Sequence, residues 1–332
     1  MSKITRRQAL AASLAFSAPA LTATVFAQTS ASNFPSRPVT LVVPFTPGSG
    51  SDTISRIIGP RLAERWKQAV VVENRAGASG NLGADRVAKA APDGLTLLMA
   101  INTFTMTPAM YKSLPYNPIA DFTPITRLAS ANFALVVNSD VPAKDVKSLV
   151  AWVKSQPAGK LNYGSPGNGT PHHLGMELMK SSVGIDVVHV PYKGISGALT
   201  DLLGGQVQMM FASFHSVLPQ VRAGKLRMLG LTGATRSTLL PDVPTFREQG
   251  LTVLEAVDAW YAVMAPAGVA PALAERLHRD FVEVMQEGDV RSKLAEQGLI
   301  VQTGTPAELR DLIASDIARW KKVVADARIQ AE

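Results

Sequence analysis

The 332-residue sequence contains no cysteine, so it forms no disulfide, has no thiol nucleophile and offers no cysteine for lipid attachment. Its weakly apolar run from Ala9 to Phe26 is rich in Ala, Ser and Thr and is broken by Pro19. That leaves too little hydrophobicity for a stable membrane span. Lys and Arg do not gather into runs interleaved with aromatic residues, so we expect no nucleic-acid partner.

Enzyme motifs are absent as well. No P-loop lysine follows a glycine-rich loop, and GxGxxG, HExxH and GxSxG do not occur. No serine has a recognisable base in a motif, which weighs against a secreted hydrolase. The five histidines are His172, His173, His189, His215 and His278. No two of them are spaced i, i+4 on one helix, as a metal site would need. We therefore expect no catalysis, no metal and no cofactor.

The N-terminal sequence pattern predicts an export signal. Lys3, Arg6 and Arg7 precede the apolar run, and small residues stand at Val25 and Ala27, where a signal peptidase reads them. We expect residues 1–27 to be cleaved near Ala27, which lowers the formal net charge from +7 to +4 and leaves a protein that is freely soluble outside the cytoplasm. The hexapeptide TRRQAL also resembles a twin-arginine signal, so the Sec and Tat routes both stay open.

Alternating strand and helix patterns fill the rest of the chain, whose 46% hydrophobic content is enough for a full core. Short apolar segments predict strands at 39–43, 70–72, 95–100, 133–137, 161–163, 187–190, 207–211, 228–231 and 260–265. Helical spacing predicts helices between most of them and near 273–285 and 305–324. This order predicts an α/β protein with two doubly wound domains. The first domain would comprise 34–132 and 258–332, and the second 133–257.

Two glycine-containing loops stand out because each lies between a strand and a helix. In the loop before the helix at 171–179, Thr170 is the expected N-cap and Pro171 the first helical residue. In the loop after the strand at 39–43, Asp52 is the expected N-cap. Such loops present free backbone N–H groups at the positive end of a helix dipole and suit a small anion. Each loop alone could be an ordinary turn, but the pair favours a binding cleft.

A third contact is predicted at 102–105, where polar residues follow a buried apolar strand. Open α/β sheets place their ligands at the carboxyl ends of the strands. His173 could cap or polarise its loop, although holding a backbone carbonyl is the more ordinary role for such a histidine. Met209 and Met210 are expected in the core.

Several segments in this order resemble the Bug proteins, the periplasmic receptors of tripartite tricarboxylate transporters. They are VVPFTPGSGSD at 42–52, VVENRAGASGNLGADRVAKAAPDGLTLL at 71–98, YGSPGNGTPHHL at 163–174, VHVPYKG at 188–194, LLGGQVQMMF at 202–211 and LPDVPTFREQG at 240–250. The resemblance implies a type II periplasmic-binding-protein fold, in which two α/β domains joined by two crossing segments close on a small carboxylate. Ser49 departs from the family by replacing the second glycine of its usual Pro-Gly-Gly.

Together, the pattern and the resemblance predict a receptor that captures a small mono-, di- or tricarboxylate, aromatic or not. The expected partners are the ligand and the membrane subunits of a transporter, with the receptor itself a monomer. A receptor serving a membrane sensor kinase stays open as an alternative. The residues expected to contact the ligand are Phe45, Thr46, Ser49, Gly50, Ser51, Asp52, Asn102, Thr103, Ser165, Asn168, Gly169, Thr170, His173, Lys193, Ala212 and Ser213.

Overall fold

The computed structural model describes residues 34–326 and 329, so the predicted export signal lies outside the described residues. The strands are β1 (Val39–Val43), β2 (Val70–Asn74), β3 (Thr96–Ile101), β4 (Phe122–Asn138), β5 (Asn162–Ser165), β6 (Val188–Pro191), β7 (Met209–Ser213), β8 (Leu226–Leu231), β9 (Asp258–Pro266) and β10 (Leu299–Val301). The α-helices are α1 (Gly50–Trp66), α2 (Asn81–Ala88), α3 (Thr103–Met110), α4 (Val146–Lys154), α5 (Pro171–Val183), α6 (Ile195–Leu203), α7 (Phe214–Arg222), α8 (Pro271–Gln286), α9 (Gly288–Glu296) and α10 (Pro306–Asp326). Two short 3₁₀ helices are η2 (Ala78–Gly80) and η3 (Thr252–Ala256).

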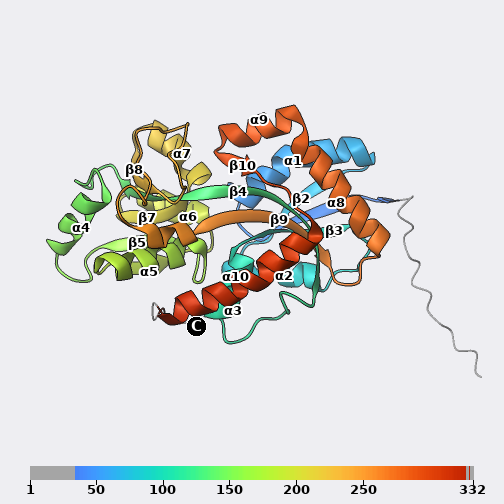
Figure 1. Ribbon diagram of the computed structural model, residues 1–332, viewed down its shortest axis with the longest axis horizontal. Helices are drawn as coiled ribbons and strands as arrows, with labels where there is room; N and C mark the ends of the chain where they lie inside the picture. The colour runs from blue at the N-terminus through green and yellow to red at the C-terminus, as the bar shows by residue number, and fades with distance from the viewer. Residues whose placement is uncertain (1–33, 327–328, 330–332) are drawn as a thin grey trace, which may run out of the picture.

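The ten strands form one sheet with the order β2-β1-β3-β9-β4-β7-β5-β6, and β8 and β10 also pair with β4. On one side β1 is parallel to β2 and β3, and on the other β5 is parallel to β6 and β7. The long strands β4 and β9 are antiparallel to each other and run through the middle of the molecule (Figure 1). Helices cover the sheet on either side of them. This arrangement confirms the predicted α/β fold.

Strand β4 changes partners along its length. It pairs with β9 up to Asn132, which stands opposite Asp258, and with β7 from Phe133, which stands opposite Ser213. The predicted boundary between 132 and 133 falls at this change. That the two halves of the sheet are separate domains stays a prediction.

The predicted apolar positions form the core. In α1, Ile54, Ile58 and Leu62 are fully buried, as their helical spacing indicates. Met209 and Met210 are buried as expected. The largest hydrophobic cluster contains residues from both halves of the sheet, among them Leu41 of β1 and Phe211 of β7. The core is therefore continuous beneath the two sets of loops.

Six elements were not predicted from the sequence, namely α3, α7, α9, β10, η2 and η3, and of β4 only 133–137 was predicted. Residues 102–105, expected as a turn, are instead the start of α3, whose N-cap is Asn102. Helix α3 contains three threonines and Pro108, and α7 contains Pro219, residues that lower helix propensity. Tertiary packing overrides that preference, since Met106 of α3 and Val217 of α7 are fully buried.

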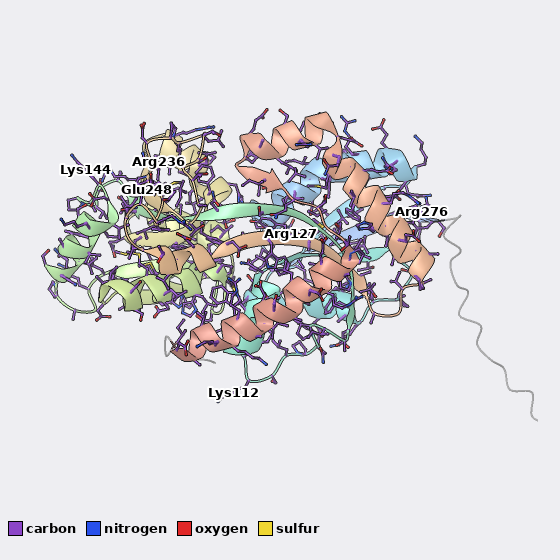
Figure 2. The ribbon with its side chains drawn as sticks, in the orientation of Figure 1. Lys112, Arg127, Lys144, Arg236, Glu248 and Arg276 are labelled. Carbon is purple, nitrogen blue, oxygen red and sulfur yellow. The ribbon has the colours of Figure 1, made fainter. Side chains whose placement is uncertain are left out.

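The segment between β8 and β9 returns the chain to the middle of the sheet without regular strands. Figure 2 shows Arg236 and Glu248 side by side in this segment, and their Nε and Oε1 atoms are 3.0 Å apart. Glu248 also accepts a hydrogen bond from the Thr245 amide at 2.7 Å, and Phe246 is fully buried. These contacts fix the route by which the chain re-enters at β9.

Close packing of α5 on β7 predicts that Gly175 tolerates no side chain. A Cβ atom there would lie 2.5 Å from the Phe211 ring, whereas one on exposed Gly288 would meet nothing within 4 Å. Urea unfolding should show Gly175→Ala destabilised by roughly 1–3 kcal/mol, although alanine favours helix. The control Gly288→Ala should be neutral or gain up to about 1 kcal/mol. Equal stability of both variants and the wild type would contradict this packing.

Candidate functional site

The predicted ligand residues lie at or just beyond the carboxyl ends of the parallel strands β1, β3, β5, β6 and β7. Most of them are buried, and Ser51, Asn102, Ser165 and Thr170 are 0% exposed. Lys193 differs, because it is exposed in the loop after β6. The structure therefore gathers the predicted side chains at one edge of each half-sheet.

The loop between β1 and α1 is capped by Ser49, and the prediction that Asp52 is the N-cap is wrong. Ser49 has extended backbone angles, φ −69° and ψ 159°, and its Oγ accepts a hydrogen bond from the Asp52 amide at 3.4 Å. Asp52 is the third residue of the helix. Its carboxylate reaches back to accept from the Gly48 amide at 3.0 Å, one residue before the N-cap, whereas a capping box uses the amide of the N-cap itself. Because Ser49 needs no glycine-like angles, serine fits where the family usually has glycine.

Asp52 is 3% exposed, and its carboxylate is fully paired within its own half. It accepts from Arg56 Nε at 3.0 Å and from Asn74 Nδ2 at 2.9 Å. Burial alone would raise the pKa of Asp52, but the hydrogen bonds from Arg56, Gly48 and Asn74 outweigh burial and lower that pKa. The negative charge is thus taken up by Arg56, Asn74 and the Gly48 amide.

The loop between β5 and α5 is capped by Thr170 with Pro171 as the first helical residue, as predicted. The Thr170 hydroxyl donates to Gly167 O at 2.7 Å and accepts from the His173 amide at 3.4 Å. Ser165 Oγ lies 2.6 Å from His189 Nε2 and 3.1 Å from Gly167 O. Both hydroxyls are therefore engaged within the loop in this conformation.

His173 secures the same loop, but through an amide and not through the expected carbonyl. Its Nδ1 accepts a hydrogen bond from Gly169 N at 3.1 Å, which makes the ring the neutral Nε2–H form. The ring stacks on His189 with centroids 4.2 Å apart. Burial, with a smaller contribution from Lys180, lowers the pKa of His173 to about 4. The histidine holds the loop in shape without adding charge.

After these internal bonds, few donors are left at the two helix starts. Among the described residues, the amides of Gly50 and Ser51 in α1 and of His172 in α5 have no protein acceptor. Helix starts leave such amides unpaired, and they carry the positive end of the helix dipole. The side-chain atoms Asn102 Oδ1 and Thr103 Oγ1 are likewise buried without a partner in the described part of the chain.

Contacts between the two halves close the site, and the sequence did not predict them. Ser79 Oγ, just before α2, donates to Asn168 O at 2.5 Å and accepts from the Tyr111 hydroxyl at 3.1 Å. Ser196 Oγ donates to Pro47 O at 3.1 Å. Ser79 lies in the segment 71–98 that carries the resemblance, and a helix was expected to start at about Ser196, but no pattern assigned a contact to Ser79, Tyr111 or Ser196.

Comparison with known proteins identifies the family. Residues 54–329 match the model of the tripartite tricarboxylate transporter family receptor. The chain belongs to this family. It is a family of receptors, which confirms the prediction that the protein is not an enzyme.

Relatives of this receptor support the same assignment. The chain is 36% identical over 307 residues to the protein BugT of Bordetella pertussis, covering 92% of this chain and 94% of BugT. It is similar to the structure of R. palustris Rpa4515 with adipate, with 34% identity, a TM-score of 0.86, and coverage of 90% of this chain and 100% of the other. It is also similar to MatC of Rhodopseudomonas palustris with bound malate, with 34% identity, a TM-score of 0.83, and coverage of 88% and 100%. These likenesses confirm the periplasmic-binding-protein fold, and the family implies a location outside the cytoplasm.

The described ranges of this receptor contain neither a candidate membrane span nor a candidate metal site. Among residues 34–326, no helix has the length and apolarity to cross a membrane. The same residues contain no group of His, Asp and Glu side chains arranged to hold a metal ion.

The pairing of Asp52 predicts a pH-dependent contribution to stability. Asp52→Asn should lower the free energy of unfolding near pH 7 by roughly 1–3 kcal/mol, because charge-assisted hydrogen bonds are lost. The folded pKa is lowered, so the carboxylate stabilises the protein above its ordinary pKa of about 4, and the contribution fades as pH falls through the folded pKa. Urea unfolding of both proteins at pH 7 and below pH 4 measures this. The control Asp326→Asn removes an exposed pair with Lys322 and should change little. A pH-independent gap would contradict the prediction.

The buried histidines predict acid sensitivity. Burial lowers the pKa of His172 and His189 to about 3, and of His173 and His215 to about 4. The unfolded chain binds these protons near pH 6.5, so stability should fall as pH drops from about 6.5 towards 4, by up to roughly 1.4 kcal/mol per pH unit for each histidine. Urea unfolding at pH 7, 6 and 5 tests this window. A constant free energy of unfolding between pH 7 and 5 would show that the rings protonate freely in the folded state.

Proposed function

We propose that this receptor binds the carboxylate of a small organic acid between the starts of α1 and α5. The observation that carries the proposal is the set of unpaired amides at Gly50, Ser51 and His172, held in buried positions by loops that satisfy their own polar groups. The relatives whose structures contain adipate and malate support a carboxylate as the ligand class.

Helix dipoles supply the positive potential for such a site. Each helix start carries about half a positive charge, so two of them balance one carboxylate without a lysine or arginine in contact with it. Arg56 is engaged by Asp52, and Lys193 is exposed in the loop after β6. The hydroxyls of Ser49 and Ser51, 3.4 Å apart, add polar contacts at the start of α1. Ser165 and Thr170 act mainly by shaping the second loop.

Access to a buried site requires the halves to separate, and we infer a hinge at the central strands. The domains would be 34–132 with 258–332, and 133–257, joined where β4 changes partners and where β9 begins. The bonds from Ser79 to Asn168 O and from Ser196 to Pro47 O would then hold the closed form. A hinge of this kind needs only a few residues to change their backbone angles.

Membership of the family supports a wider role. The receptor would be exported with its signal cleaved near Ala27, act in the periplasm as a monomer, and deliver the carboxylate to the membrane subunits of a tripartite transporter. The ligand would enter and leave unchanged, as expected for a member of a receptor family.

Isothermal calorimetry with adipate, malate and a panel of other mono-, di- and tricarboxylates, each beside its amide, tests the proposal. The acid should bind and its amide should bind roughly ten- to hundredfold more weakly, the effect of losing one charge-assisted hydrogen bond. Thr170→Ala should weaken binding by a similar factor, because it removes the cap that shapes the loop. Ser49→Gly should retain binding, because glycine is nearly as good an N-cap as serine.

The matched control is Thr305→Ala, which removes the capping hydroxyl of α10 far from the two loops. It should lower stability without changing affinity. Equal affinity for acid and amide, with Thr170→Ala unchanged, would overturn the carboxylate site, and so would binding of no carboxylate in the panel.

A further inference from the structure

A cluster of four buried polar side chains lies beside the proposed carboxylate position. We call His172, Ser213, His215 and Tyr261 the histidine cluster. His172 is the second residue of α5, Ser213 caps α7, His215 is the second residue of α7 and Tyr261 lies on β9. All four are at least nine-tenths buried. Helix α5, the start of α7 and strand β9 thus bring polar side chains together, although they are far apart in the sequence.

Contacts connect this cluster to the start of α1. Ser213 Oγ lies 3.2 Å from His172 Nε2, and Ser213 is near enough to the Tyr261 hydroxyl to act on the pKa of Tyr261. Tyr261 in turn packs against Gly50, where a Cβ atom would lie 2.2 Å from the Tyr261 oxygen. The His215 ring meets the Tyr261 ring edge-on, with centroids 6.1 Å apart. The cluster therefore borders the amides proposed to hold the carboxylate.

Three ring nitrogens in the cluster lack partners. Within the described residues, neither Nδ1 nor Nε2 of His215 has a hydrogen bond, and Nδ1 of His172 has none. His215 is 5% exposed and His172 is 6% exposed. An unpaired buried polar group is costly, and native proteins pair nearly all of them. Two adjacent imidazoles in this state, beside a binding site, indicate polar groups kept for a ligand.

The chemistry of these rings selects the kind of group they bind. Burial lowers the pKa of His215 to about 4, and burial together with His215 lowers the pKa of His172 to about 3, so both rings are neutral at pH 7. No carboxylate or cation contributes to either pKa. A neutral imidazole offers one N–H donor and one nitrogen acceptor, the complement of a hydroxyl group. A second carboxylate would be buried here without a cation, which is much less favourable.

We propose that His215, together with His172, binds an uncharged hydroxyl group of the ligand, so that the receptor selects hydroxycarboxylates over carboxylates lacking the hydroxyl. The inference rests on the proposed function, since the carboxylate at the helix starts brings the hydroxyl to the cluster. Sites built to hydrogen-bond a hydroxyl discriminate strongly against analogues without it, because their own polar groups are then left unpaired.

Matched pairs of acids test this proposal by calorimetry: 3-hydroxybutyrate with butyrate, and malate with succinate. The wild type should bind the better enantiomer of at least one hydroxy acid about tenfold or more tightly than its partner. His215→Leu should remove that preference by weakening the hydroxy acid and leaving the deoxy acid unchanged. His215→Gln, which keeps a donor and an acceptor, should restore part of it.

The control His278→Leu makes the same change at a part-buried histidine whose Nδ1 lies 3.0 Å from Ile125 O, outside the cluster. It should leave the preference intact. Equal affinity for both members of every pair, or an unchanged preference in His215→Leu, would overturn the hydroxyl subsite while leaving the carboxylate site standing. If no carboxylate binds the wild type, both the hydroxyl subsite and the carboxylate site are overturned.

Nitrogen-15 NMR of the imidazoles provides a readout that needs no variant to fold. In the wild type, the ring nitrogens of His215 should shift when the preferred hydroxy acid is added and much less with its deoxy partner at saturation. Identical His215 spectra with the two acids would overturn the proposal.

Discussion

Strand β4 is the element on which the rest of the structure depends, because it belongs to both halves of the sheet. Up to Asn132 it pairs with β9 and from Phe133 with β7, so one strand sets the register of the strands on both sides. The strands that end in the two glycine-containing loops, β1 and β5, are built outward from it. The relative positions of the two loops therefore depend on this strand pairing.

The same geometry explains why the polar groups of the two loops are so unevenly satisfied. Within each loop, side chains close most of the local bonds: Asp52 takes the Gly48 amide, and His173 takes the Gly169 amide. What is left unpaired lies at the first residues of α1 and α5. A helix cannot satisfy those amides from within. A buried helix start without an acceptor therefore points to an acceptor that comes from outside the chain.

Much of this could be predicted from the sequence, because strand periodicity and helix caps are local signals. The cap at Thr170, the buried stripe of α1 and strand β9 followed from such patterns, whereas only residues 133–137 of β4 were predicted. Asp52 was misassigned because serine and aspartate both cap helices, and only the backbone angles show that the helix begins at Gly50. The contact of Ser79 with Asn168 joins residues 89 positions apart, and no local pattern encodes it. Nothing in the sequence singles out His215, because no histidine has a partner at i, i+4 spacing. Its proximity to His172 exists only in the folded chain.

The distribution of charge around the site connects these observations. Asp52 lies in the first turn of α1, where a free carboxylate would compete with an anionic ligand for the same dipole. Its carboxylate is instead taken up by Arg56, Asn74 and the Gly48 amide, and it leaves the Gly50 and Ser51 amides available. The histidines nearby are neutral because burial disfavours their charged forms. A ligand with one carboxylate and one hydroxyl would therefore meet positive potential only at the helix starts and neutral hydrogen-bonding groups beyond them. Discrimination between acids then depends on where their uncharged oxygens lie.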